Sequence, residues 1–334
     1  MTLPDAPGRL RVAVAVCTRD RPAQLRRALR SLLEQRPPAG ELLVVDNAPR
    51  DAATRELVGE LEGVRYALEP EPGLDRARNR ALRETEAAVV AFLDDDAVAH
   101  PDWARALTAA FDDPRVGACT GRVEALALDT EAQRLFEANG GYARGTTGIR
   151  LPRDARRPLH GRSAPLIAWT VSVGNGSSLA VRRDLALELG AFDEALDRGP
   201  ALPGGGDLDV LWRVLAAGSD VVYEPAALAW HEHRQDLDSM FDQLAGHQRA
   251  LTAMLLKNAL HGPRRASLLA FLGWRLLKPG VRLALRALGR DPLPARALVR
   301  MWGSCWRGLG SYPLHRLRPA GAGRPAPPGS GASA

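Results

Sequence analysis

The sequence predicts an α/β fold in which a mostly parallel sheet is covered by helices and is followed by a helical extension. Short apolar runs alternate with segments of helical periodicity through the first half of the 334-residue chain, which is the pattern of strand–helix units. Polar residues follow these runs directly, at the positions where ligands bind in such sheets. Beyond residue 235 the apolar segments have helical spacing and many arginines.

The first strand is expected at Arg11–Thr18, an apolar run ended by Arg19 and Asp20. Pro22 begins the next helix, whose leucines and alanines recur with helical spacing and form one apolar stripe. Further strands are expected at Leu42–Asn47, Val64–Leu68, Ala88–Leu93 and Val116–Glu124, with helices after Gly73 and Pro101.

The next part of the chain is less regular. Residues 125–165 are rich in Arg and Gly and are expected to form loops and short helices over the sheet. After them we expect a strand within Trp169–Val181, helices at Arg182–Leu189 and Asp207–Ala217, and strands at Val221–Glu224 and Ala229–His233.

Composition divides the chain into three parts. Residues 8–235 are expected to form the α/β domain, 236–318 a basic helical extension, and 319–334 a disordered tail of Gly, Ala, Pro and Ser. Because proline removes a helical hydrogen bond, we expect the helices of the extension to be broken at four prolines, Pro263, Pro279, Pro292 and Pro294.

Positive charge is concentrated in the extension. Residues 236–318 contain fourteen Lys or Arg against four Asp or Glu, whereas the whole chain has a formal net charge of +6. With Trp274, Trp302 and Trp306, this pattern is typical of helices that lie on an anionic membrane surface. The alternative is helices packed on the first domain with a solvated arginine face. No recognition motif accompanies the charge, which argues against nucleic acid as a partner.

Cysteine usage and the N-terminal residues predict the compartment. Cys17, Cys119 and Cys305 lie far apart and match no disulfide or zinc spacing. The chain begins without a basic segment followed by an apolar one, and no run is long enough to span a bilayer. We therefore expect a cytoplasmic protein that can bind peripherally to the inner face of the plasma membrane.

Three adjacent carboxylates, Asp94, Asp95 and Asp96, follow the apolar run at Ala88–Leu93. No strand is followed by a G-x-G-x-x-G or P-loop motif, so glycine-rich backbone is not what would hold a phosphate. Adjacent carboxylates repel one another, and a divalent cation removes that cost. The alternative is an acidic turn that caps the following helix.

A second polar group, Arg76, Arg78 and Asn79, stands at the start of a helix within PGLDRARNRAL (72–82). Guanidinium groups in that position could pair with phosphates. The alternative is an exposed basic helix face.

Taken together, these motifs resemble those of family 2 of the glycosyltransferases. The resemblance implies the GT-A fold of nucleotide-diphospho-sugar transferases, a Rossmann-like and mostly parallel sheet, with residues 8–235 as the catalytic domain. The matching segments occur in the family's order over roughly residues 11–235 and are VAVCTRDRPAQL, LLVVDN, GLDRARNRAL, FLDDD, GNGSSLAVRR, GGGDLDVLWRVLAAG and YEPAALAWHEHR.

The resemblance implies a donor site for a nucleotide-diphosphate sugar. Asp46 is expected to hydrogen-bond the base, and the residues at Thr18 to Asp20 to lie against the nucleoside, turn or capping roles being the alternative. The expected donor-binding residues are Thr18, Arg19, Asp20, Asp46, Asn47, Arg76, Arg78, Asn79, Asp94 and Asp95.

The resemblance also implies a Mn²⁺ or Mg²⁺ ion, with Asp96, Asp94 and His231 as its ligands. His233 competes with His231 for this role, and a structural histidine is the alternative. Imidazole favours a transition metal such as Mn²⁺.

By the same resemblance, Asp207 is the base that takes the proton of the acceptor hydroxyl in an inverting transfer. Gly206 precedes it where the family has Glu, which leaves the acceptor contacts of that Glu unassigned, and helix capping is the alternative role for Asp207.

The expected acceptor or sugar pocket contains Asn175, Ser177 and Asp209. Hydrogen-bonded strand or bulge positions are the alternative for the first two, and for Asp209 a second expected role is to orient Arg213.

The implied function is glycosyl transfer to a saccharide, lipid-linked or small-molecule hydroxyl, in cell-envelope polysaccharide or glycolipid synthesis. Two alternatives remain open. The missing Glu suggests a non-catalytic sugar-nucleotide-binding relative, and the basic extension suggests a membrane- or partner-docking module.

Overall fold

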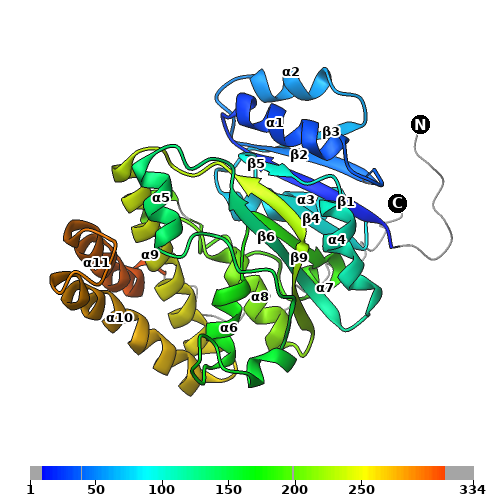
Figure 1. Cartoon of the computed structure of the whole chain (residues 1–334). Coiled ribbons are helices and arrows are strands. Elements are labelled where there is room, and N and C mark those ends of the chain that lie inside the picture. The colour runs from blue at the N-terminus through cyan, green and yellow to red at the C-terminus, as the bar shows by residue number, and fades with distance from the viewer. Residues whose placement is uncertain (1–9, 39, 198, 313–334) are drawn as a thin grey trace, which may run out of the picture.

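The computed structural model describes residues 10–38, 40–197 and 199–312. A nine-stranded mixed sheet forms its centre, and a bundle of long C-terminal helices packs beside the sheet (Figure 1). The expected tail at 319–334 lies outside the described residues.

The first half of the sheet is parallel, as expected. Strands run in the order β3-β2-β1-β4, and the helices that join them are amphipathic. Alternate residues of β1 face two cores: Val14 and Val16 pack with Leu25 and Leu29, whereas Ala15 packs on the other face. The elements are β1 Val12–Thr18, α1 Pro22–Leu33, β2 Glu41–Asn47, α2 Ala53–Gly59, β3 Val64–Glu69, α3 Leu74–Glu84 and β4 Val89–Leu93.

The second half of the sheet is mixed. β8 (Ser178–Arg182) runs antiparallel between β4 and β6 (Val116–Ala125), so its first residue pairs with Leu93 at the end of β4. β9 (Asp220–His231) is parallel to β6. β5 (Ala97–Ala99) and β7 (Ile149–Leu151) pair antiparallel with β9. These antiparallel pairings return later segments to the edge at which the parallel strands end.

The remaining elements of this domain cover the sheet and its edge. They are α4 Trp103–Ala109, α5 Glu131–Ala138, α6 Leu166–Val173, α7 Arg183–Glu188 and α8 Gly206–Ala216, with 3₁₀ turns at Ala110–Asp112, Arg153–Arg156 and Gly199–Ala201.

Three expectations about local structure differ from the fold. The segment expected to contain a strand at Trp169–Val181 begins as α6, and its strand starts only at Ser178. The two strands expected after Val221 form the single strand β9, whose pairing with β6 shifts register between Gly121 and Arg122. β5 and β7 were not expected, because three-residue strands leave too little apolar pattern to detect.

The extension consists of α9 (Leu237–His261), α10 (Arg265–Ala287) and α11 (Ala295–Ser311). The breaks expected at Pro263, Pro292 and Pro294 lie between these helices. The break expected at Pro279 was wrong, because α10 continues through it.

Donors from α11 explain this continuity. The carbonyl of Arg275, which loses its helical partner at Pro279, accepts from the Cys305 thiol at 3.7 Å, and the next carbonyl, that of Leu276, accepts from Trp302 Nε1 at 2.9 Å.

The extension shares its core with the first domain. Leu251, Met254 and Leu255 of α9 pack with Trp212 of α8. The change in charge at residue 236 therefore does not coincide with a break in packing.

Asp209 of α8 also joins the first domain to α9 of the extension through hydrogen bonds. Its side chain is fully buried and accepts hydrogen bonds from Arg213 Nε at 2.7 Å, Lys257 Nζ at 2.8 Å and Asn258 Nδ2 at 2.8 Å. Burial raises the pKa of the Asp209 carboxyl, but the charges of Lys257 and Arg213 outweigh this and the pKa is lowered.

We predict that Asp209→Asn lowers the free energy of unfolding by about 3 kcal/mol at pH 7, because it removes the carboxylate that faces buried cations. The lowered pKa means that the stabilisation is complete above the unfolded-state value of about 4 and is lost as the pH falls through the folded-state value. Denaturant unfolding of both proteins between pH 7 and pH 3 measures the difference.

Asp242→Asn is the matched control, since this α9 carboxylate is 74% exposed in its pair with Arg300 and should change stability by less than about 0.5 kcal/mol. Equal stability of the Asp209 variant and the wild type would contradict the role of this contact.

Candidate active site

A cleft of about 980 Å³ opens at the carboxyl ends of β1, β2 and β4, next to the end of β9. This is the edge at which ligands bind in sheets of this kind. Eight of the predicted donor or metal residues line it: Thr18, Arg19, Asn47, Arg76, Asp94, Asp95, Asp96 and His231.

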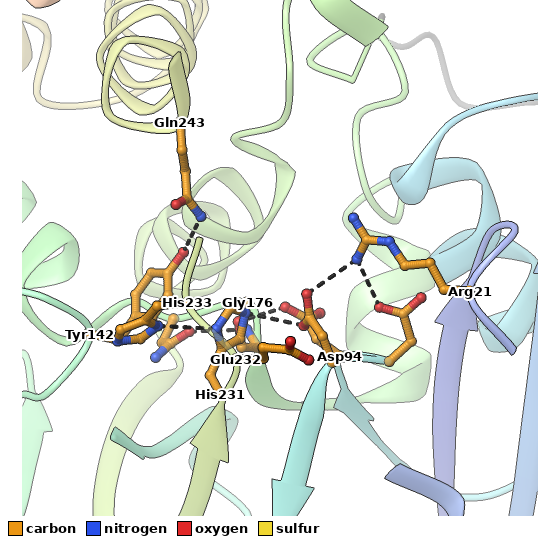
Figure 2. Close-up of polar contacts among 12 residues, drawn as sticks. Arg21, Asp94, Tyr142, Gly176, His231, Glu232, His233 and Gln243 are labelled. Atoms are coloured by element: carbon orange, nitrogen blue, oxygen red, sulfur yellow. Dashed lines mark hydrogen bonds and ion pairs between the residues drawn. The ribbon is translucent and has the colours of Figure 1, made fainter. Parts of the chain in front are cut away.

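Asp94, Asp96 and His231 converge in this cleft, and each offers a ligand atom within 4.8 Å of the others. The antiparallel pairing of Ala97 with His231 places the imidazole beside the acidic turn, and its Nε2 lies 3.1 Å from Asp96 Oδ1 (Figure 2). Two carboxylates and an imidazole nitrogen form a donor set that fits a divalent ion, Mn²⁺ in particular. The prediction that His231 rather than His233 reaches the acidic turn agrees with this geometry.

The charges of this cluster perturb one another. Burial raises the pKa of Asp96, but the hydrogen bond and charge of His231 outweigh it and the pKa is lowered. Burial lowers the pKa of His231, and the Asp96 hydrogen bond and charge raise it overall.

Asp95 is not part of the cluster formed by Asp94, Asp96 and His231. It accepts from Thr18 Oγ1 at 2.7 Å and from Arg21 Nη1 at 3.1 Å, and the same Arg21 nitrogen reaches Asp96 Oδ2 at 3.1 Å (Figure 2). Burial raises the pKa of Asp95 to about 6 against the opposing charge of Arg21. Arg21 was not among the predicted site residues, although it directly follows the polar residues that end β1.

Asp94 faces residues that precede β8. Its Oδ2 accepts from Ser177 Oγ at 2.5 Å. Its Oδ1 lies 3.8 Å from Arg78 Nη2, which also donates to the Gly176 carbonyl at 3.3 Å. Arg78 is buried, so it is not part of an exposed basic face. It instead supports the acidic turn from inside the protein.

The other residues of the GLDRARN segment divide between the cleft and the core. Arg76 lines the cleft and pairs with Glu194 at 3.1 Å. Asn79 is buried away from the cleft lining, where it donates to the Phe192 carbonyl and accepts from the Phe192 amide. Asn47 lines the cleft and also holds the loop before α3, because it accepts from the Gly73 amide at 2.8 Å.

Asp20 and Asp46 lie outside the lining of the cleft. Asp20 has a φ of 55° and accepts from the Arg50 amide at 2.9 Å, which is a turn role. Asp46 is fully buried, and its Oδ2 accepts from Tyr66 Oη at 3.0 Å. Its Oδ1 has no hydrogen-bond partner within the described ranges. Burial raises the pKa of Asp46.

Asp207, the predicted base, is not among the residues that line the cleft. It lies in the first turn of α8, after Gly204 and Gly205, which both have a φ of 108°. Its carboxylate lies against Gly176 and close to Arg78: a Cβ on Gly176 would be 2.8 Å from Asp207 Oδ2 and 2.9 Å from Arg78 Nη2. No hydrogen bond is formed by the Asp207 carboxylate among the residues that the structure describes. The absence of a side chain at Gly176 thus lets Asp207 approach the residues that support Asp94.

The predicted acceptor residues separate. Ser177 contacts Asp94, and the neighbouring Asn175 accepts from the Ser177 amide at 3.0 Å. None of the three predicted pocket residues is among those that line the cleft, and Asp209 is fully buried. Of its two expected roles, the orientation of Arg213 is the one that the contacts match.

Gly206 is explained by a neighbour from α3. A Cβ at Gly206 would overlap the carboxylate of Asp75, which is 1% exposed and whose Oδ2 has no partner in the described part of the chain. Burial raises the pKa of Asp75 well above its ordinary value, against the charge of Arg78. Asp75 therefore occupies the space that a larger residue at position 206 would need.

The cleft is completed by residues that the sequence did not single out. Tyr142, from the irregular segment, and Gln243, from α9, both line it, and Gln243 Nε2 donates to Tyr142 Oη at 3.1 Å (Figure 2). The Tyr142 ring meets the His231 ring edge-on at 5.0 Å. Arg234, three residues beyond His231, adds an exposed cation to the lining. Part of the extension thus belongs to the cleft.

The sheet order and the helices that cover it define a protein of the GT-A fold. Residues 13–187 match the model of glycosyl transferase family 2. The chain belongs to this family, as its motifs indicated.

Curated relatives and solved structures agree with this assignment. The chain is 26% identical over 304 residues to the pre-mycofactocin glycosyltransferase of Mycobacterium tuberculosis, covering 89% of this chain and 59% of that protein. It thus spans less than two thirds of that relative.

Two solved structures share the fold. The mannosyltransferase PcManGT from Pyrobaculum calidifontis, in complex with GDP-Man and Mn²⁺, has 20% identity and a TM-score of 0.58, with 95% of this chain and 90% of that chain covered. GalNAc-T7 with UDP, GalNAc and Mn²⁺ has 16% identity and a TM-score of 0.51, with coverages of 74% and 48%.

Proposed function

We propose that this chain is a metal-dependent, inverting glycosyltransferase that moves a sugar from a nucleotide-diphosphate donor to a hydroxyl acceptor. The observation that carries the proposal is the convergence of Asp94, Asp96 and His231 in a cleft at the carboxyl ends of the parallel strands. Both similar structures contain Mn²⁺ together with a nucleotide or a sugar nucleotide, which supports a divalent ion and a nucleotide-sugar donor for this chain.

A divalent ion held by Asp94, Asp96 and His231 would neutralise the charge that develops on the leaving diphosphate. Arg19, Arg76 and Arg234 line the same cleft and supply cations for the donor phosphates. Arg21 bridges Asp95 and Asp96, and the other oxygen of Asp96 faces His231. These residues bind and orient the donor.

Asp207 is the proposed base. A direct displacement at the anomeric carbon needs one carboxylate to take the acceptor proton and no covalent intermediate. The Asp207 carboxylate is partly exposed and forms no hydrogen bond within the described ranges, so its oxygens are free to accept that proton. Its contact with Gly176 places it beside the residues that hold Asp94.

For the acceptor we propose the hydroxyl of a saccharide, a lipid-linked molecule or a small molecule, in cell-envelope polysaccharide or glycolipid synthesis. The support is the family together with the apolar and basic extension, which adjoins the cleft through Gln243.

We predict that Asp207→Asn retains donor binding and lowers the transfer rate by about 10²- to 10⁴-fold, because the variant keeps the shape of the site and loses the base. A panel of sugar nucleotides with Mn²⁺ provides both readouts, as a thermal shift for binding and as released nucleoside diphosphate for turnover. Asp184→Asn, at a carboxylate that is 87% exposed on α7, is the matched control.

Full activity of Asp207→Asn would refute the assignment of the base. Donor binding by the wild type without transfer to any acceptor in a cell extract would instead favour a non-catalytic relative.

We further propose that the extension binds peripherally to an anionic membrane, at the cytoplasmic face. The support is an apolar stripe on the outer side of α10, where Trp274, Leu277, Val281 and Leu288 are 46–68% exposed, together with the half-exposed Trp306 on α11. Figure 1 shows both helices at the outside of the molecule.

The charges beside this stripe complement anionic lipid. Arg264, Arg265, Arg286 and Arg290 are exposed at or near the two ends of α10, and such flanking cations attract lipid phosphates. None of the helices in the described part of the chain combines the length and the apolar character needed to cross a bilayer.

We predict that the full chain floats with liposomes containing phosphatidylserine, and that Leu277→Ser/Leu288→Ser lowers the bound fraction at least tenfold. These side chains are 61% and 68% exposed. Each leucine that is transferred into the lipid interface contributes about 1.5 kcal/mol to the free energy of membrane binding. The control is Leu126→Ser/Leu128→Ser, two exposed leucines beyond the end of β6. Equal flotation of both double variants and the wild type would contradict the proposal.

A further inference from the structure

A chain of polar contacts leads away from the metal cluster into the protein. Beyond His231 Nε2, which faces Asp96, His231 Nδ1 lies 3.4 Å from His233 Nδ1 (Figure 2). His233 Nε2 lies in turn 2.7 Å from Glu137 Oε1. Residues two apart on an extended segment point to the same side, which is how the end of β9 brings both imidazoles into one line.

One arrangement of hydrogens on two neutral rings satisfies every donor and acceptor in this series of contacts. An ionised glutamate only accepts, so His233 Nε2 carries a hydrogen, and a neutral imidazole then has a lone pair on Nδ1. His231 must donate its Nδ1 hydrogen to that lone pair. These hydrogen bonds would leave the Nε2 lone pair of His231 for a divalent ion shared with Asp94 and Asp96, in place of the Nε2 contact with Asp96 Oδ1.

Packing surrounds His233 and Glu137, the two residues of this contact series that lie farther from the metal cluster. His233 is 3% exposed and its ring lies 4.8 Å from Phe136 and 5.6 Å from Tyr142. Glu137 lies on α5, whose first turn is fixed by a capping box between Thr130 and Gln133. The Glu137 carboxylate also lies directly over Gly141, where a Cβ would overlap it. His233 is thus packed against both aromatic rings, and the Glu137 carboxylate lies between the His233 ring and Gly141.

We propose that Glu137 and His233 are positioning residues for the metal site, holding His231 in the tautomer and ring orientation in which Nε2 faces Asp94 and Asp96. The inference rests on the metal site of the proposed function. Carboxylate or carbonyl partners of ligating histidines raise metal affinity by about 10- to 100-fold. Here the His233 ring lies between the carboxylate of Glu137 and the ligating His231. The role of Glu137 is independent of contact with donor or acceptor.

The test is Mn²⁺ binding by the full chain without any sugar nucleotide. Electron paramagnetic resonance measures free Mn²⁺ during a titration and thus gives the dissociation constant. Electron spin-echo modulation of the bound Mn²⁺ detects the ¹⁴N nucleus of a coordinated imidazole. We expect Glu137→Ala to weaken Mn²⁺ binding at least tenfold and to reduce the ¹⁴N modulation, and Glu137→Gln to restore most of both, because its amide oxygen still accepts from His233.

Glu131→Ala is the matched control, since Glu131 is an exposed glutamate on the same helix, and it should bind Mn²⁺ as the wild type does. If Glu137→Ala does not fold, two variants of His233 carry the same test. His233→Asn offers an oxygen near the position of Nδ1 and should bind Mn²⁺ more tightly than His233→Leu, which offers no acceptor.

The outcomes separate this inference from the proposed function. Wild-type affinity and ¹⁴N modulation in Glu137→Ala, or equal binding by the two His233 variants, would overturn the positioning role and leave the metal site standing. A wild-type chain that binds no Mn²⁺ would overturn the proposed metal site and the positioning role with it.

Discussion

The antiparallel pairing of β5 with β9 brings Asp96 and His231 together, and the candidate site depends on this contact. Ala97 follows the acidic turn directly and lies opposite His231 in the sheet, so the backbone ladder itself fixes the separation of carboxylate and imidazole. The pairing of β8 with β4 does the same for Ser177 and Asp94, because Leu93 lies opposite Ser178. Two strand pairings thus bring Asp96 and His231, 135 residues apart in the chain, and Asp94 and Ser177, 83 residues apart, into contact.

The second constraint is charge. Five carboxylates, those of Asp75, Asp94, Asp95, Asp96 and Asp207, gather near one end of the sheet. Arg21 and Arg78 offset part of this charge from either side. The raised pKa values of Asp75 and Asp95 reflect how strongly burial disfavours the ionised forms. A divalent ion at Asp94, Asp96 and His231 would neutralise the negative charge that the two arginines leave unbalanced. The acidic turn is therefore better tolerated with the ion bound.

Sequence reasoning reached the parallel half of the sheet and the polar residues at its carboxyl edge because both follow simple patterns. Apolar runs of strand length mark β1 to β4, and the polar residues that end them fall at one edge, so Thr18, Asp94 and Asp96 could be placed without a structure. Asn79 and Asp209 were assigned to binding by motif alone. Their hydrogen bonds to Phe192 and to Lys257 come from tertiary packing, which no spacing in the sequence reveals.

The residues that were missed share a physical reason. Tyr142, Glu137 and Gln243 come from outside the matching motifs. Only the folded chain brings Tyr142 against His231, Glu137 against His233 and Gln243 against Tyr142. Asp75, on α3, fills the space beside Gly206. This contact joins positions that are far apart in the sequence. Pro279 remains helical because Cys305 and Trp302 supply donors to its turn, so a local rule was overridden by a neighbouring helix.

In the proposed function a divalent ion joins the acidic cluster to the donor diphosphate. Calorimetric titration with GDP and with UDP, with and without Mn²⁺, tests it most directly. The account predicts that Mn²⁺ tightens binding of at least one nucleotide tenfold or more, that the nucleotide tightens Mn²⁺ binding by the same factor, and that Asp96→Asn removes this coupling. Nucleotide binding of equal affinity with and without Mn²⁺ would contradict it.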